Sequence, residues 1–350
     1  MKIQRRSVLA LGLAAPFAGV AVGGKAMAQS GPITVRMQGI GANASTLPET
    51  YARTVGLFEK NGLNVQFLPP IFNANSVMAV AVQGQADFAY TGGSAIVPVV
   101  QQGRPMKVVA TILSGLDLKV SLTKVALEKL AKQGVTQNSS VEERVRALRG
   151  LRLGAPTVGS LTDLSFRYSM KKYGIDPKEL TIQPMADMTA LLAALRQGVV
   201  DGVVGTASTT SGRAETEGLA MRYLAFEESD PLLRAFPTYI IAVSDEYLQK
   251  NPEAVRRVLT VFSQAKAAIR RGLTDAEFAE VKKQFFPDTP QASYDYGHSV
   301  TVPALKASIV PKDEQLVSLL AINNAMAENP AKLTFAQVFD SRIAAEIEKP

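Results

Sequence analysis

The chain has 350 residues, of which 47% are hydrophobic and 20% are charged, and its formal net charge is +7. This length and composition allow one large or two medium-sized globular domains. The chain contains no cysteine, which excludes disulfide scaffolds, thiolate metal sites, cysteine nucleophiles and a lipid-anchored cysteine. Several of the positive charges lie in the first 25 residues, so the rest of the chain is only modestly basic and we expect no nucleic-acid binding.

The first 28 residues have the layout of a cleavable export signal. Lys2, Arg5 and Arg6 precede an apolar run that Pro and Gly interrupt, and the small-residue sequence AMA ends at residue 28. We expect cleavage before Gln29 and a periplasmic location. The paired arginines also fit a twin-arginine signal, so both the Sec and the twin-arginine routes stay open. A transmembrane anchor is the alternative interpretation of this segment.

From residue 33 the sequence predicts alternating strands and helices. Apolar runs bounded by Gly and Pro predict strands at 33–39, 64–70, 86–92 and 106–113, and helices at 46–62, 75–84 and 93–103. The alternation starts again with strands at 151–155, 180–185, 199–206 and 221–226, and helices at 161–174 and 187–198. Such alternation implies mainly parallel sheets with helices on both faces. Residues 115–150 read as charged and helix-prone around a loop, and residues 238–350 read as one strand followed by helices.

One phrase occurs in both halves of this alternation. Gln83-Gly84-x-x-Asp87 and Gln197-Gly198-x-x-Asp201 each follow a predicted helix and precede a predicted strand. Glycine can end a helix in the left-handed conformation, and aspartate can accept hydrogen bonds from the N–H groups of a tight turn. We therefore interpret both aspartates as structural rather than as paired catalytic carboxylates, and we expect them at equivalent turns of two similar lobes.

The order and spacing of these segments resemble a known family. GLFEKNGLNVQFLPP followed by VQGQADFAYTGGSAIVPVVQQGRPMKVVA is similar to the first lobe of periplasmic substrate-binding proteins of ABC importers. LRGLRLGAPTVGSLTDLSFRYSMKKYGIDPKEL, RQGVVDGVVGT and PTYIIAVSDEYLQKNPEAVRRVL resemble the second lobe and the return of the chain to the first. The branch resembled is the nitrate, sulfonate and taurine group, which is NMT1/THI5-like and includes pyrimidine-precursor proteins. Residues 115–150 are longer than is usual there.

The resemblance implies an α/β fold of the type II periplasmic binding protein kind, with two lobes and two hinge strands. Lobe 1 would comprise residues 30–113 and 238–350, and lobe 2 residues 114–237. The implied function is capture of a small anionic solute of the sulfonate, nitrate or carboxylate type, and its delivery to the permease subunits. A monomer with no catalytic residues, cofactor or metal is implied. A sensor partner that presents its ligand in the periplasm, or a pyrimidine-precursor binding or biosynthetic relative, remains the alternative.

Ligands of parallel sheets gather where the strands end and the loops enter helices. The loops in question are GIGANASTL, YTGGSA, APTVGSLTD and VGTASTTSG, and all are rich in Gly, Ser and Thr. Their N–H groups and hydroxyls can hold an anion, or can simply cap helices. The candidate solute-binding residues are Ile40, Asn43, Thr91, Gly92, Gly93, Ser94, Ser114, Thr157, Gly159, Ser160, Leu161, Thr162, Asp187, Thr206 and Ser208.

Three further expectations concern particular positions in the chain. The start of the helix after Gly159 should bind an acidic group of the solute, facing Gly93 and Ser94 of the other lobe. Asp187 is expected to cap a helix, with contact to a ligand amine as the alternative. His298 is the only histidine, so a histidine-cluster metal site is excluded and the residue is expected to be a packing or surface histidine.

Overall fold

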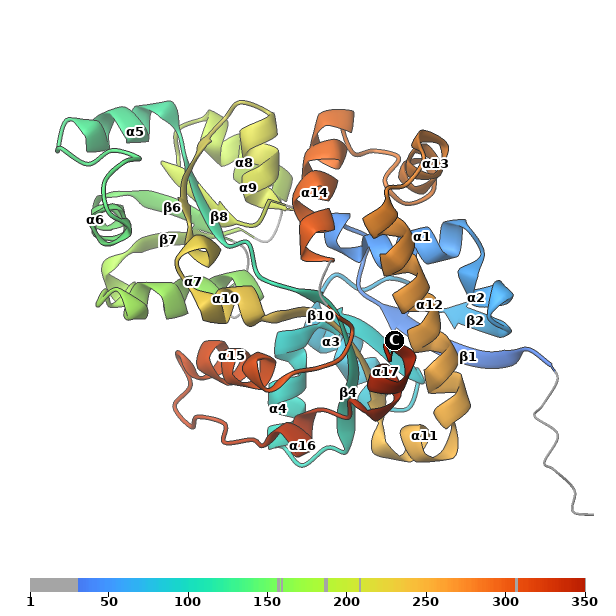
Figure 1. Cartoon of the computed structure of the whole chain (residues 1–350). Coiled ribbons are helices and arrows are strands. Elements are labelled where there is room, and N and C mark those ends of the chain that lie inside the picture. The colour runs from blue at the N-terminus through green and yellow to red at the C-terminus, as the bar shows by residue number, and fades with distance from the viewer. Residues whose placement is uncertain are drawn as a thin grey trace, which may run out of the picture. The chain divides into compact units, whose positions relative to one another are not determined.

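The computed structural model describes residues 31–155, 158, 160–185, 188–207, 209–305 and 308–349. Their strands form two five-stranded sheets flanked by helices, which confirms the predicted two-lobed α/β architecture (Figure 1). The predicted export signal lies outside the described residues. Among the described helices, none combines the length and the apolar character needed to cross a bilayer.

The first sheet combines strands from the start of the chain with one strand from far downstream. Its order is β2-β1-β3-β10-β4. Strands β2 and β3 run parallel to β1, whereas β10 pairs antiparallel with both β3 and β4. The strands are β1 (Ile33–Gly39), β2 (Leu63–Phe67), β3 (Phe88–Gly92), β4 (Met106–Ser114) and β10 (Pro237–Ser244).

The second sheet repeats this plan. Its order is β7-β6-β8-β5-β9, with β7 and β8 parallel to β6 and with β5 antiparallel to β8 and β9. The strands are β5 (Lys119–Leu122), β6 (Arg152–Ala155), β7 (Thr181–Pro184), β8 (Gly202–Gly205) and β9 (Met221–Ala225). Strand β5 is not predicted from the sequence, because its four residues lie inside a charged stretch that reads as helical. In each sheet the inserted antiparallel strand is the one that has just arrived from the other sheet.

Helices flank both sheets and make up most of the chain after β10. Those before β5 are α1 (Leu47–Thr54), α2 (Leu57–Lys60), α3 (Ala74–Val82) and α4 (Ile96–Gln101). Those between β5 and β10 are α5 (Lys124–Ala131), α6 (Val141–Ala147), α7 (Leu161–Lys172), α8 (Met188–Arg196), α9 (Thr210–Thr216) and α10 (Pro231–Ala235). The last are α11 (Asp245–Lys250), α12 (Pro252–Arg271), α13 (Asp275–Phe285), α14 (Gln291–Ala304), α15 (Asp313–Asn324), α16 (Phe335–Val338) and α17 (Arg342–Ile347).

Short 3₁₀ turns sit at several junctions. They are η1 (Ala44–Thr46), η2 (Gly93–Ala95), η3 (Leu148–Gly150), η4 (Pro177–Glu179) and η5 (Phe226–Glu228).

Both faces of the first sheet are covered, as expected for parallel strands. Ile241 and Val243 of β10 pack into a core that includes the apolar stripe of α12, while Ile240 and Ala242 face a second core. That second core continues along the connections into the other lobe. This explains why β10 reads as a continuous apolar run rather than as an alternating pattern.

The repeated aspartates occupy equivalent positions, as predicted, but they bind a different partner. Asp87 accepts from the backbone N–H of Arg36 at 2.7 Å and from its guanidinium Nη2 at 2.6 Å. Asp201 accepts the same two bonds from Arg152 at 2.8 Å and 3.0 Å. Gly84 and Gly198 have φ angles of 70° and 69°. The glycine ends the helix as expected. The aspartate binds the neighbouring strand instead of the turn, at Arg36 in the middle of β1 and at Arg152 at the start of β6.

Two connections link the sheets, and hydrogen bonds join them to each other. The N–H of Gly115 donates to the carbonyl of Phe236 at 2.8 Å, and that of Leu116 donates to Leu233 at 2.9 Å. The hydroxyl of Thr238 donates to the carbonyl of Gly115 at 2.6 Å. Gly115 has a φ of 96°, which L side chains rarely adopt, so a glycine is favoured at this bend.

Candidate functional site

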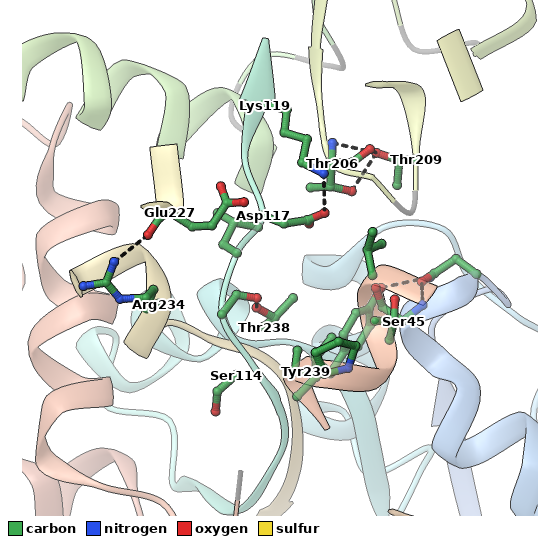
Figure 2. A pocket seen from close by; sticks show the side chains of 18 of the residues that line it. Ser45, Ser114, Asp117, Lys119, Thr206, Thr209, Glu227, Arg234, Thr238 and Tyr239 are labelled. Atoms are coloured by element: carbon green, nitrogen blue, oxygen red, sulfur yellow. Dashed lines mark hydrogen bonds and ion pairs between the residues drawn. The ribbon is translucent and has the colours of Figure 1, made fainter. Parts of the chain in front are cut away.

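A cavity of about 690 Å³ lies where these two connections meet the loops of both sheets (Figure 2). This volume suits a small organic molecule. The walls come from η1, β4, the β4–β5 connection, the start of α7, the β8–α9 loop, η5, β10 and α14. The lining includes Asn43, Ser45, Ser114, Asp117, Lys119, Leu161, Thr162, Thr206, Thr209, Arg222, Glu227, Arg234, Thr238, Tyr239, Ser299 and Thr301.

An ion pair between a buried lysine and a half-buried aspartate forms one part of the wall. The Lys119 side chain on β5 belongs to a residue that is only 4% exposed, and its Nζ lies 3.7 Å from Oδ2 of Asp117. The same Asp117 oxygen accepts from the N–H of Ala207 at 2.8 Å, and the ring of Tyr296 lies 5.8 Å from the ammonium. Burial raises the pKa of Asp117, while Lys119 and the Ala207 hydrogen bond act in the opposite direction. The pair thus places a cation in a region largely withdrawn from water.

Glu227 on η5 contributes a second acidic group to the wall (Figure 2). Its Oε2 is shielded from solvent and has no hydrogen-bond partner among the described residues. Burial, with the nearby charges of Asp117 and Glu228, raises the pKa of Glu227 to about 7. Arg234 is close but serves the backbone, because its Nη1 donates to the carbonyl oxygens of Glu227 at 2.8 Å and Glu228 at 3.1 Å.

Helix α14 lines the cavity and also contacts α9, a helix that flanks the second sheet. The hydroxyl of Tyr296 donates to Oε2 of Glu215 in α9 at 2.8 Å. The hydroxyls of Ser293 and Thr216 lie 3.0 Å apart. Oε1 of Glu215 accepts from Ser121 of β5 at 2.6 Å. These contacts tie a C-terminal helix to α9 and β5 beside the cavity.

Five of the predicted site residues line this cavity: Asn43, Ser114, Leu161, Thr162 and Thr206. Several of these polar groups already have partners. Asn43 caps η1 and donates to the hydroxyl of Tyr239 at 2.9 Å, and the Ser114 hydroxyl accepts from Gln315 at 3.0 Å. The Thr206 and Thr209 hydroxyls lie 2.9 Å apart. Their first role in the structure is therefore to shape the loops of the wall.

Six other predicted residues do not line the cavity: Ile40, Thr91, Gly92, Gly93, Ser94 and Ser160. Thr91 is buried and donates to the carbonyl of Ala74 at 3.1 Å. A Cβ on Gly93 would lie 2.0 Å from the carbonyl oxygen of Pro237, so this glycine allows β10 to approach. Ser160 caps α7 by accepting from the N–H of Asp163 at 3.3 Å. The insertion of β10 between β3 and β4 explains why the loop after β3 packs against protein.

The remaining four predicted residues, Thr157, Gly159, Asp187 and Ser208, lie outside the described residues.

The charged part of the wall is not predicted from the sequence. Asp117 and Lys119 lie in a stretch that reads as charged and helix-prone, and Glu227 is one of three acidic residues between 227 and 230. The alternation of Leu118, Val120 and Leu122 around Lys119 and Ser121 was the available signal for a strand. The missed strand explains the missed ion pair.

His298 is a packing residue, in agreement with its prediction. It is 2% exposed, lies among the rings of Phe278, Phe286 and Tyr294, and its Nδ1 is 2.6 Å from the carbonyl of Tyr294. Burial lowers the pKa of His298 to about 4. In the part of the chain that the structure describes, no group of three or more His, Cys, Asp or Glu side chains could hold a metal ion.

The family described as NMT1/THI5 like matches residues 43–271. Among curated relatives, a 4-amino-5-hydroxymethyl-2-methylpyrimidine phosphate synthase of Saccharomyces cerevisiae is 22% identical over 262 residues, which cover 72% of this chain and 70% of the relative. The periplasmic aliphatic sulphonate binding protein SsuA of Escherichia coli has a similar structure, with a TM-score of 0.66 and 16% identity over 86% of this chain and 95% of SsuA.

A second structural neighbour is the periplasmic nitrate-binding protein NrtA of Synechocystis. The TM-score is 0.55, with 14% identity over 81% of this chain and 74% of NrtA. At identities this low, the two neighbours show that the fold is shared, but they do not identify a ligand of this chain.

Proposed function

The chain belongs to the NMT1/THI5-like family, and from this membership we propose that it is the solute-binding component of an ABC importer. The observation that carries the proposal is the cavity of about 690 Å³, whose walls come from the loops of both sheets. A solute held by both lobes favours the state in which they are closed on it, because a ligand shifts an equilibrium by its differential affinity. The closed state would be the form that the permease recognises.

We propose that the solute carries an acidic group at the start of α7. The first N–H groups of a helix lack helical partners, and the helix dipole favours negative charge there. Leu161 and Thr162 of α7 line the cavity, and so does the buried ammonium of Lys119, which is paired with Asp117 at 3.7 Å. Thr157, Gly159 and Ser160 precede this helix and complete the proposed anion site. Sulfonates, carboxylates and nitrate are the candidate groups.

The first test is a thermal-shift screen of small organic acids and nitrate, followed by calorimetry on each compound that stabilises the protein. A solute at 100 times its dissociation constant should stabilise the fold by about 2.7 kcal/mol. Failure of every compound, acidic or not, in a broad metabolite library would contradict the binding function. Stabilisation by cationic compounds alone would contradict the anion site but not the binding function.

A matched pair of cap variants tests the anion site itself. Ser160→Ala should weaken binding by about 1–3 kcal/mol, as expected for loss of a hydrogen bond to a charged group. Ser140 caps α6 in the same way, but no residue of α6 lines the cavity, whereas Leu161 and Thr162 of α7 do, so Ser140→Ala should lower stability without changing affinity. Equal affinities of the two variants would show that Ser160 acts only as a cap.

We further propose lobe boundaries at residues 30–113 with 238–350, and at 114–237, with export directed by residues 1–28. The mature protein would act as a monomer in the periplasm, with permease subunits as its partners. Mass spectrometry of the exported protein should find Gln29 at the N-terminus. An intact Met1 form confined to cytoplasm or membrane would contradict the location.

The similarity to the yeast synthase keeps a biosynthetic role as the second candidate. Against catalysis, the single histidine is buried among aromatic rings and does not line the cavity of about 690 Å³. If the chain is a synthase-like enzyme, the purified protein should consume a pyrimidine precursor. A binding protein should return every bound compound unchanged after denaturation, as chromatography can establish.

A further inference from the structure

Glu227 is the polar group in the cavity wall whose hydrogen bonding is incomplete. Its Oε2 is inaccessible to solvent and has no partner among the described residues, although Glu227 lines the cavity. A buried carboxylate oxygen without a donor costs free energy, and native structures rarely keep one without a reason. Because Glu227 lines the cavity, a rotation of its side chain would bring this oxygen within reach of a solute, and a carboxylate that lacks a donor there points to a donor on the solute.

The neighbouring cations are engaged elsewhere. Lys119 pairs with Asp117 at 3.7 Å, and Arg234 donates to backbone carbonyls. Arg222 lies 3.8 Å from Glu228 and is largely exposed. No described side chain thus supplies the missing proton donor to Oε2 of Glu227.

We propose that the solute carries an N–H donor, an amine or an amino group on a ring, which donates to Glu227 inside the cavity. The proposal rests on the solute-binding function but not on the acidic group placed at α7. The solute class would be small amino-bearing compounds, and amino-bearing organic acids if both sites are correct. Asp117 adds negative charge near Glu227, which strengthens the preference for a donor or a cation (Figure 2).

The adjacent residue provides a matched control. Glu228 follows Glu227 directly, but its side chain is 67% exposed and it does not line the cavity. Glu227→Gln and Glu228→Gln remove the same charge from neighbouring positions. A melting curve of each variant establishes that it is folded before binding is measured.

The experiment uses compounds that stabilise the wild type in the library screen, each paired with the analogue that lacks its amino group. Calorimetry should show that the amino compound binds about tenfold more tightly or better in the wild type and in Glu228→Gln, as expected for a charge-assisted hydrogen bond. In Glu227→Gln this preference should largely disappear. Equal binding of both analogues to the wild type, or a preference that survives in Glu227→Gln, would overturn the proposal and leave the binding function standing.

A pH series separates two roles for the carboxyl group. The charges that act on Glu227 come from Asp117 and Lys119 of the β4–β5 region and from Glu228, with Arg222 and Arg234 also in the lining. If the solute donates to an ionised Glu227, affinity should rise between pH 6 and pH 8 in the wild type but not in Glu227→Gln. A fall in affinity over that range would mean that Glu227 donates its own proton, which contradicts the proposal. A screen in which nothing binds would remove both the function and this inference.

Discussion

The buried imidazole of His298 should make the stability of the protein depend on acid. Its pKa is lowered to about 4 by burial, whereas the unfolded chain has an ordinary histidine. Between pH 6.5 and pH 4 the unfolded state therefore binds a proton that the folded state excludes, and stability is lost as the pH falls. The loss attributable to this residue approaches about 3 kcal/mol at the lower end.

Denaturant unfolding at several pH values checks this prediction. His298→Gln cannot titrate, so the unfolding free energy of the wild type minus that of the variant should fall steadily, by about 3 kcal/mol, from pH 6.5 to pH 4. The comparison is needed because Glu227, with a pKa raised to about 7, has the opposite effect and destabilises the fold as the pH rises from about 4.5 to 7. Parallel pH curves for both proteins would mean that the pKa of His298 is the same in the folded and unfolded states, which contradicts the prediction.

Individual residues of the site were predictable only where their type matched the expected chemistry. The hydroxyl and glycine loops after parallel strands led to Asn43, Ser114 and Thr206, which line the cavity. Lys119 and Glu227 could not be found in this way, because a charged residue in a charged stretch normally faces water. Their burial depends on the pairing of β5 between two strands that lie 80 or more residues away in the chain, which no local pattern encodes.

At the scale of elements, Asp87 in the first sheet and Asp201 in the second should contribute equally to the free energy of unfolding. Asp87 and Asp201 bind equivalent backbone and guanidinium groups of Arg36 and Arg152. Asp87→Asn and Asp201→Asn should each lower the unfolding free energy by about 1–3 kcal/mol, because each removes hydrogen bonds to a charged group. The double variant should show the sum, since the sites lie in different sheets.

Urea denaturation of the two single variants and the double variant gives these values, and Asp288→Asn at an exposed position serves as the control. A large loss for one single variant and none for the other would show that the repeated phrase has different roles in the two sheets.

The elements themselves were largely predictable. Strands and helices alternate along residues 33–114 and again along residues 152–225, as the periodicity indicated, and the glycines of the repeated phrase end their helices. Two features were beyond the sequence. One is β5, whose alternation of Leu118, Val120 and Leu122 spans too few residues to outweigh the charged, helix-prone stretch around it. The other is the insertion of β10 between β3 and β4, since antiparallel pairing across so long a separation leaves no local signal.

At the scale of the whole molecule, α14 should help to hold the solute-bound state. Tyr296 donates to Glu215 across the boundary between the C-terminal helices and α9. If this contact forms only when the lobes close, Tyr296→Phe should weaken solute binding by about 1 kcal/mol, roughly fivefold, because it removes one hydrogen bond of the closed state. Calorimetry with a solute from the screen measures the effect.

Tyr173→Phe is the appropriate control, because its hydroxyl lies 3.0 Å from that of Ser229 within a single lobe. Its affinity should equal that of the wild type. A Tyr296→Phe protein that binds normally but unfolds more easily would show that the contact is part of the static fold.

The exchange of strands between the sheets has a consequence for synthesis on the ribosome. All strands of the second sheet lie between Lys119 and Ala225, but β3 and β4 receive their common neighbour only when Pro237–Ser244 has been translated. The part of the chain that is made second can therefore complete its sheet before the part that is made first. Hydrogen exchange on a released chain truncated near residue 235 should find β6 and β8 protected while β3 and β4 still exchange. The sheet whose strands are translated second would then be the first to assemble.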